Sequence, residues 1–225
     1  MDSVALSKLD RLFWLGRYIE RTLIEIEVMQ EAYDQSIDGP AFDYRTFCAE
    51  LEIPNTYEDT EDFIRRFLFD RKDPYSVIST LNYAYDNAIV LRESISSAAL
   101  SYIQMAVNIM ESEANGVAPM LELQSVTDML YAFRGCSDDA ILEISSRYTL
   151  RCGYTIERID LAVRIGHKPE NLNREFSRLN HRMQYTPLRR DANRLMLLLG
   201  LAANPDPKSN RAILLDCVEG LFIDV

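Results

Sequence analysis

Apolar residues recur at intervals of three or four along most of the chain, the spacing that places side chains on one face of a helix. The clearest run lies between Ser3 and about Tyr33 and contains Leu6, Leu9, Leu12, Phe13, Ile19, Leu23 and Ile26. The sequence has no run that alternates apolar and polar residues in steps of two, and no Asn-Gly or Asp-Gly pair between two β-branched runs. The pattern therefore predicts an all-α protein.

Proline, glycine and capping residues divide the rest of the chain into further helices. We expect them over about 44–51, from Thr60, from an Asp73-Pro74 cap to about Ser112, over 119–133, from a cap at 137–139 to Ile165, and over about 170–183, 188–201 and 210–222. Several of these helices exceed 20 residues, so an antiparallel bundle of long helices is the natural way to bury their apolar faces. We expect a single all-helical domain over residues 1–225.

The excess of acidic over basic residues limits the kinds of partner that the chain can bind. With 24 Lys and Arg against 35 Asp and Glu, the net charge is −11, which disfavours binding to a phosphate backbone, and we predict no nucleic-acid partner. The longest apolar stretch, residues 195–203, is far shorter than the roughly 20 residues that cross a bilayer. No membrane association is expected, and because the N-terminus lacks the pattern of a signal peptide, the predicted location is cytoplasmic.

Chemistry-bearing residues give little support for catalysis. Four well-separated cysteines without a C-x-x-C pair are expected to be reduced core thiols, and both His167 and His181 are expected at the surface. The sequence contains no G-x-S-x-G, Walker phosphate loop, H-E-x-x-H or G-x-G-x-x-G motif. We therefore predict no cofactor and no metal.

One internal similarity stands out, because residues 16–21 and 153–158 share the pattern G-x-x-I-E-R. Gly16 and Glu20 fall within the apolar arc of the first helix, while Gly153, Glu157, Asp160 and Arg164 line one side of the second. A glycine four residues before each glutamate allows a second backbone to approach closely. The pattern predicts an internal pseudo-repeat that brings Glu20 and Glu157 face to face in the core.

Three interpretations of these acidic residues remain open. They can form a buried ion-pair lattice with Arg17, Arg21, Arg92, Arg158 and Arg164, because an unpaired buried carboxylate is costly. The same groups can bind a carboxylate-bearing or phosphorylated small molecule through guanidinium contacts. A dimetal site is a third interpretation, although the Glu-x-x-His pairs of such bundles are missing, since Arg164 and Arg178 stand three residues before the two histidines.

Three segments carry a resemblance to a known family. Residues 12–21 (L-F-W-L-G-R-Y-I-E-R) closely resemble the opening signature of the Alpha-E family, a bacterial all-helical domain named for its E-R motif. Residues 73–78 (D-P-Y-S-V-I) resemble its N-P-S-S-I helix start, and residues 153–158 its second G-x-x-x-E-R. Where the family tends to have R-E-N-A-R-x-x-R-E, residues 85–93 keep Asn87, Ala88, Arg92 and Glu93 but have Tyr85 and Ile89 in place of two arginines.

The resemblance implies a helical domain without an established reaction. Such domains are commonly encoded beside, or fused to, a circularly permuted ATP-grasp ligase and a transglutaminase-like cysteine peptidase, in systems thought to make and remove peptide or amide tags. This implies a non-catalytic accessory or binding module with the ligase or the transglutaminase-like protein as its partner. The binding or polar core is then expected to comprise Arg17, Glu20, Arg21, Asn87, Arg92, Glu93, Glu157, Arg158, Asp160 and Arg164.

Two competing hypotheses belong to other classes. In an enzyme, Glu20 and Glu157 would act as an acid-base pair on a peptide-like or carboxylate-bearing substrate, and at least one of them would be accessible in a cleft. In a homo-oligomeric scaffold, exposed aromatic residues such as Tyr131 and Phe133 would form an interface.

Overall fold

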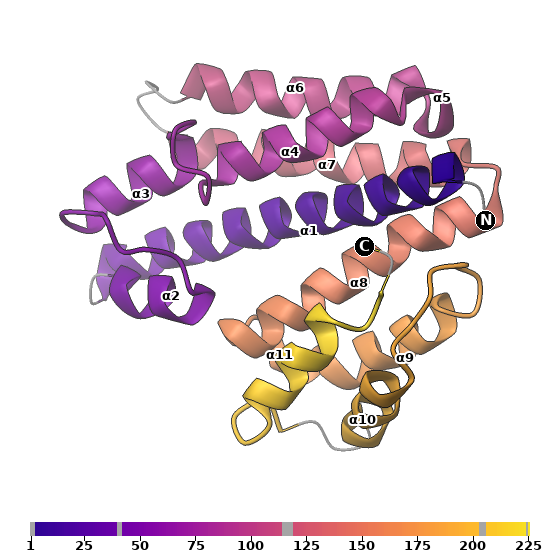
Figure 1. The fold of residues 1–225 in the computed structure, drawn as a ribbon. Coiled ribbons are helices and arrows are strands. Elements are labelled where there is room, and N and C mark those ends of the chain that lie inside the picture. The colour runs from indigo at the N-terminus through magenta and orange to yellow at the C-terminus, as the bar shows by residue number, and fades with distance from the viewer. Residues whose placement is uncertain (1–2, 40–41, 114–118, 203–205, 224) are drawn as a thin grey trace. The chain divides into compact units, whose positions relative to one another are not determined.

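The computed structural model describes residues 3–39, 42–113, 119–202, 206–223 and 225, and shows an all-α protein (Figure 1). Its α-helices are α1 (Ser3–Asp38), α2 (Tyr44–Leu51), α3 (Thr60–Phe69), α4 (Val77–Val90), α5 (Arg92–Ile95), α6 (Ser97–Glu113), α7 (Pro119–Ala140), α8 (Ile144–Arg164), α9 (Leu172–Arg182), α10 (Ala192–Ala202) and α11 (Arg211–Glu219). A short 3-10 turn, Pro169–Asn171, precedes α9. Within the described ranges the β pairing is limited to an isolated antiparallel bridge between Arg190 and Phe222. The predicted fold class is confirmed.

Contacts divide the chain into two compact units. Unit 1 combines residues 1–20 with residues 141–225, and unit 2 comprises residues 21–140. Helix α1 belongs to both units: its first half, residues 3–20, is in unit 1 and its second half, residues 21–38, is in unit 2.

Unit 2 is built around α4, α6 and α7. Helices α6 and α7 are antiparallel, because Ser96 at the start of α6 lies 3.9 Å (Oγ to Sγ) from Cys136 near the end of α7. Phe133 is fully buried, so it cannot form the predicted interface, whereas Tyr131 is 57% exposed. Aromatic rings of α2, α3 and the adjoining loops form a second apolar cluster, in which the rings of Phe63 and Phe67 stack with centroids 5.1 Å apart.

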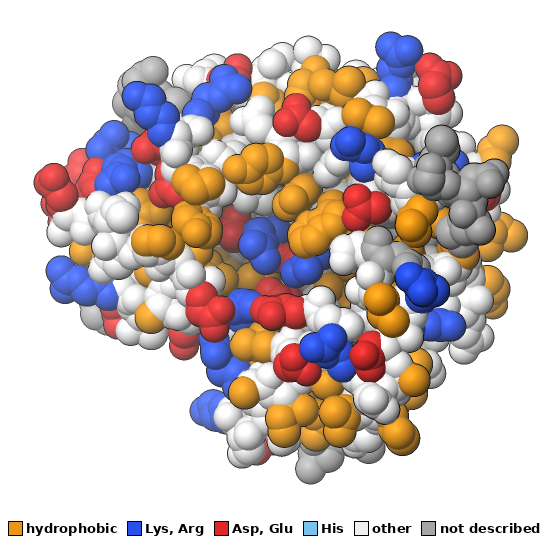
Figure 2. Space-filling model, viewed as in Figure 1, with side chains coloured by type: hydrophobic (Ala, Val, Ile, Leu, Met, Phe, Trp, Pro, Cys, Tyr) orange, Lys and Arg blue, Asp and Glu red, His pale blue; other side chains and the backbone are white. Residues whose placement is uncertain are grey.

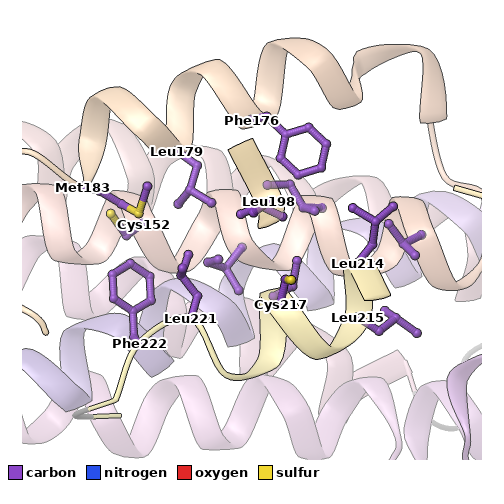
Figure 3. Packing of buried hydrophobic residues seen from close by; sticks show 14 of the residues in the cluster. Cys152, Phe176, Leu179, Met183, Leu198, Leu214, Leu215, Cys217, Leu221 and Phe222 are labelled. Atoms are coloured by element: carbon purple, nitrogen blue, oxygen red, sulfur yellow. The ribbon is translucent and has the colours of Figure 1, made fainter. Parts of the chain in front are cut away.

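Unit 1 has its own apolar core, which α8, α9, α10 and α11 share with the first turns of α1 (Figure 3). Phe176 and Leu179 of α9 face Leu214 and Cys217 of α11 within this cluster. Helices α8 and α9 are antiparallel, since contacts join the start of α8 to the end of α9 and the end of α8 to its start. A short connection between two long helices produces this arrangement.

Two predicted helix starts were wrong. The helix after Asp73-Pro74 begins at Val77, where the Ser76 hydroxyl accepts a hydrogen bond from the Ser79 amide at 3.2 Å. The Asp73 carboxylate is used elsewhere, because it accepts from the Tyr57 hydroxyl at 2.8 Å and from the amide of Tyr75. Helix α7 runs through residues 137–139 to Ala140, and the next helix, α8, starts only at Ile144.

Three further observations concern membrane-spanning helices, surface charge and the cysteines. No helix among the described residues is long and apolar enough to cross a bilayer. Figure 2 shows acidic, basic and apolar side chains interspersed on one face. All four cysteines are free, and burial raises the pKa of the Cys152 thiol to about 12 and that of Cys48 to about 11.

The first turn of α8 predicts an acid-sensitive contact. Hydrogen bonds from the hydroxyl of Ser146, from Lys8 and from the hydroxyl of Ser145 hold the pKa of Glu143 at about 2. Because this value lies below the usual pKa of about 4.3, the group stabilises the fold fully above about pH 4.5, and the stabilisation is lost as the pH falls towards 2.

We expect NMR titration of the Glu143 carboxyl to give this low pKa, and Ser146→Ala to raise it because that change removes the largest cause. Lys8→Met should raise it by a smaller amount. An ordinary pKa in the unsubstituted protein would contradict the assignment.

Candidate functional site: the buried pairs of the E-R helices

The two G-x-x-I-E-R segments lie against each other at a close approach of α1 and α8. A Cβ added to Gly153 would overlap the carbonyl oxygen of Phe13 and lie 3.1 Å from the Cα of Gly16. A Cβ on Gly16 would likewise overlap the carbonyl oxygen of Leu150. Both glycines are therefore required by the approach of the backbones.

Helices α1 and α8 run in the same direction at this contact. Ion pairs join residue 8 to 143, residue 17 to 157 and residue 20 to 158, so positions advance together along both helices. This pair differs from the antiparallel arrangement expected from the sequence. The parallel direction is what places the same motif position of both helices at one level.

Crossed ion pairs follow directly from that alignment. Arg17 Nε donates to Glu157 Oε2 at 2.6 Å. Arg158 donates through Nε to Glu20 Oε1 at 2.6 Å and through Nη2 to Oε2 at 3.1 Å, which is bidentate geometry. Each glutamate is thus bound by an arginine of the other segment. The side chain of Glu157 is 1% exposed and that of Glu20 5%.

Arg158 extends this pairing to a third helix. Its Nη1 lies 3.5 Å from Oε2 of Glu175 on α9, whose Oε1 also accepts from Arg178 at 2.5 Å. Burial alone would lower the pKa of Arg158, but the charges of Glu20 and Glu175 raise it above its usual value. The guanidinium therefore stays charged and connects α1, α8 and α9.

A separate ion-pair group closes the C-terminal end of α8. Arg164 Nε lies 3.2 and 3.1 Å from the two carboxylate oxygens of Asp160, and its Nη2 donates to Glu219 of α11. Asp160 is buried and Arg164 is 10% exposed. The predicted line of polar residues on α8 therefore exists, and its two ends bind different helices.

The other predicted residues, Arg21, Asn87, Arg92 and Glu93, lie in unit 2. Arg92 and Glu93 pair with each other at 3.2 Å with side chains 57% and 88% exposed, so this pair is not one of the buried ion pairs. Asn87 and Arg21 are half-buried. Ile89, at a position where the family tends to have arginine, is 47% exposed.

The arrangement is suited to fixing helices rather than to reaching a substrate. A general acid or base must come within hydrogen-bond distance of the reacting group, and the carboxylates of Glu20 and Glu157 are both enclosed and bound by guanidinium groups. Over the part of the chain that the structure describes, no group of three or more His, Cys, Asp and Glu side chains is placed to hold a metal ion.

The helices and the crossed pairs together define an all-helical domain organised by two Glu-Arg segments. Residues 7–202 match the Alpha-E family, a predicted alpha-helical domain with a conserved ER motif, and the chain belongs to that family. No curated protein and no solved structure gives a match.

The close approach predicts an unusual sensitivity to a single methyl group. Gly153→Ala should lower the free energy of unfolding by about 3 kcal/mol, because the added Cβ meets backbone atoms that cannot move independently of α1. Gly200→Ala is the matched control in α10 of the same unit, where an added Cβ meets nothing within 4 Å. That change should raise the free energy by up to about 1 kcal/mol. Equal effects of the two substitutions in urea unfolding would contradict the packing argument.

The crossed pairs predict a second difference in stability. Glu157→Gln should cost about 3 to 5 kcal/mol, because it leaves Arg17 without its counter-charge. Glu20→Gln should cost less, because Arg158 keeps the carboxylate of Glu175. For a chain of this length, a loss of about 3 to 5 kcal/mol should lower the melting temperature by roughly 6 to 20 °C. Glu93→Gln, in an exposed pair, should change melting by less than about 2 °C. Melting curves in which all three variants coincide would refute a structural role.

Proposed function

We propose that the chain is a non-catalytic accessory or binding module of an ATP-grasp amide or peptide ligase and transglutaminase-like peptidase system. The observation that carries the non-catalytic part is the enclosure of both motif glutamates by arginines of the opposite helix. An acid-base pair needs at least one carboxylate open to substrate.

Membership of the Alpha-E family supports the choice of partner, through the gene neighbourhood that the resemblance implies. In this role the crossed pairs hold α1, α8 and α9 in one register, and the surfaces of these helices meet the partner. A rigid surface loses little conformational entropy on association, which favours binding.

The test combines the purified chain with the ATP-grasp ligase encoded beside it. We expect the two to elute together in size-exclusion chromatography and the chain to change the ATP-dependent ligation rate by severalfold, while the chain alone turns over no peptide substrate. Glu157→Gln, assayed well below its melting temperature, should keep both the association and the rate effect.

Two results would oppose the proposal. One is the absence of association together with an unchanged ligation rate. The other is turnover of a peptide-like substrate by the chain alone that Glu157→Gln abolishes while the protein remains folded, a result that would establish the enzyme hypothesis instead.

A further inference from the structure

A cleft with basic walls lies between α8 and α9, outside the crossed pairs. Its volume is about 430 Å³, within the range of sites for small molecules. Four arginines line it: Arg151 from α8, and Arg174, Arg178 and Arg182 from α9. We call these residues, with Tyr148 and His181 beside them, the arginine cleft.

The cleft contrasts with the acidity of the chain as a whole. Unit 2 carries 8 Lys and Arg against 22 Asp and Glu, whereas unit 1, which holds the cleft, carries 16 against 13. The negative charge of the chain therefore belongs to unit 2. No acidic residue stands among the described residues that line the cleft.

The buried carboxylate of Glu175 lies behind the cleft and is the shared partner of several arginines. Glu175 is 6% exposed and accepts from Arg178 at 2.5 Å and from Arg158 at 3.5 Å, with Arg174 Nε at 3.9 Å. Arg158 is in turn bound to Glu20. Two buried carboxylates, Glu20 and Glu175, thus face three guanidinium groups, so the wall of the cleft keeps a positive field.

Arg182 shows the effect of that field. Its Nη1 donates to two neutral acceptors, the carbonyl oxygen of Arg151 at 2.8 Å and the hydroxyl of Thr155. Burial lowers the pKa of Arg182, and the charge of Arg158 lowers it further. An anion in the cleft would relieve this repulsion.

Aromatic contacts hold the opposite wall in place. The guanidinium of Arg151 lies over the ring of Tyr148 at 5.1 Å, and that ring stacks on Tyr185 with centroids 4.5 Å apart. His181 contacts the ring of Tyr185 at 5.2 Å. These contacts order Arg151 and His181 before a ligand arrives, which reduces the entropic cost of binding.

We propose that the arginine cleft binds a small molecule with two or more oxyanion groups. The arginines of α9 recur every fourth residue, so their Cα atoms extend over about 12 Å at a rise of ~1.5 Å per residue, more than one phosphate or carboxylate can contact. Guanidinium groups bind phosphate and carboxylate groups alike in bidentate geometry. This proposal does not rest on the ligase partnership, because it is argued only from the side chains that line the cleft.

The experiment titrates the purified full chain with pyrophosphate, citrate and inorganic phosphate by isothermal titration calorimetry at low ionic strength. Pyrophosphate and citrate should bind at least about tenfold more tightly than phosphate, and their affinity should fall with added salt. Tighter binding of pyrophosphate assigns the site to phosphate esters, and tighter binding of citrate assigns it to polycarboxylates.

Matched variants locate the binding. Arg174→Gln should weaken binding about tenfold, and it should fold normally because that side chain is 60% exposed and 3.9 Å from its carboxylate partner. Arg174→Lys should recover part of the affinity, since it keeps the charge and loses the bidentate contact. Arg65→Gln removes the same charge from an exposed position of α3 and should leave binding unchanged.

Three results would overturn the assignment. The first is that neither pyrophosphate nor citrate binds at millimolar concentration. The second is that phosphate binds as tightly as both of them. The third is that Arg174→Gln and Arg65→Gln weaken binding equally. The circular dichroism spectrum of each variant establishes that it is folded before titration.

Discussion

The close approach of two helix backbones at Gly16 and Gly153 is the constraint on which the rest of unit 1 depends. With any larger residue at either position the helices would separate, and the arginines could no longer reach the glutamates of the opposite helix. The glycines set the distance, and the charges then set the register. A buried arginine with a bidentate carboxylate tolerates little sliding or rotation, so the pairs fix one of the many ways in which two apolar faces can pack.

The helices could be predicted from the sequence because helix-breaking prolines and glycines and the spacing of apolar residues are local signals. Their starts could be predicted less well, because a capping residue is chosen by its surroundings. Asp73 has the side chain of a good cap, yet it accepts a hydrogen bond from the hydroxyl of Tyr57, and Ser76 caps the helix instead. Residues 137–139 also look like a cap, and α7 continues through them because the apolar face that includes Phe133 is already buried there.

The glutamates of the site could be predicted, and their partners only in part. An apolar arc that contains Glu20 and Glu157 indicates buried carboxylates, but Arg17 and Arg21 flank the same arc, and only the direction of α8 decides that Arg17 meets Glu157. The arginine cleft was missed, because a highly charged short helix is usually a solvated one. The available signal was the spacing of Arg174, Arg178 and Arg182 opposite a buried Phe176.

Because unit 1 combines two separate stretches of the chain, it can be completed only after unit 2 has been synthesised. Residues 3–20 are synthesised before unit 2 and α8 after it, and Arg158 is 138 residues downstream of Glu20. At ordinary elongation rates this delay is roughly 10 s. During this interval the apolar face of residues 3–20 and the carboxylate of Glu20 stay exposed to water, while unit 2 is synthesised and forms its own contacts. A chaperone would matter most at this stage.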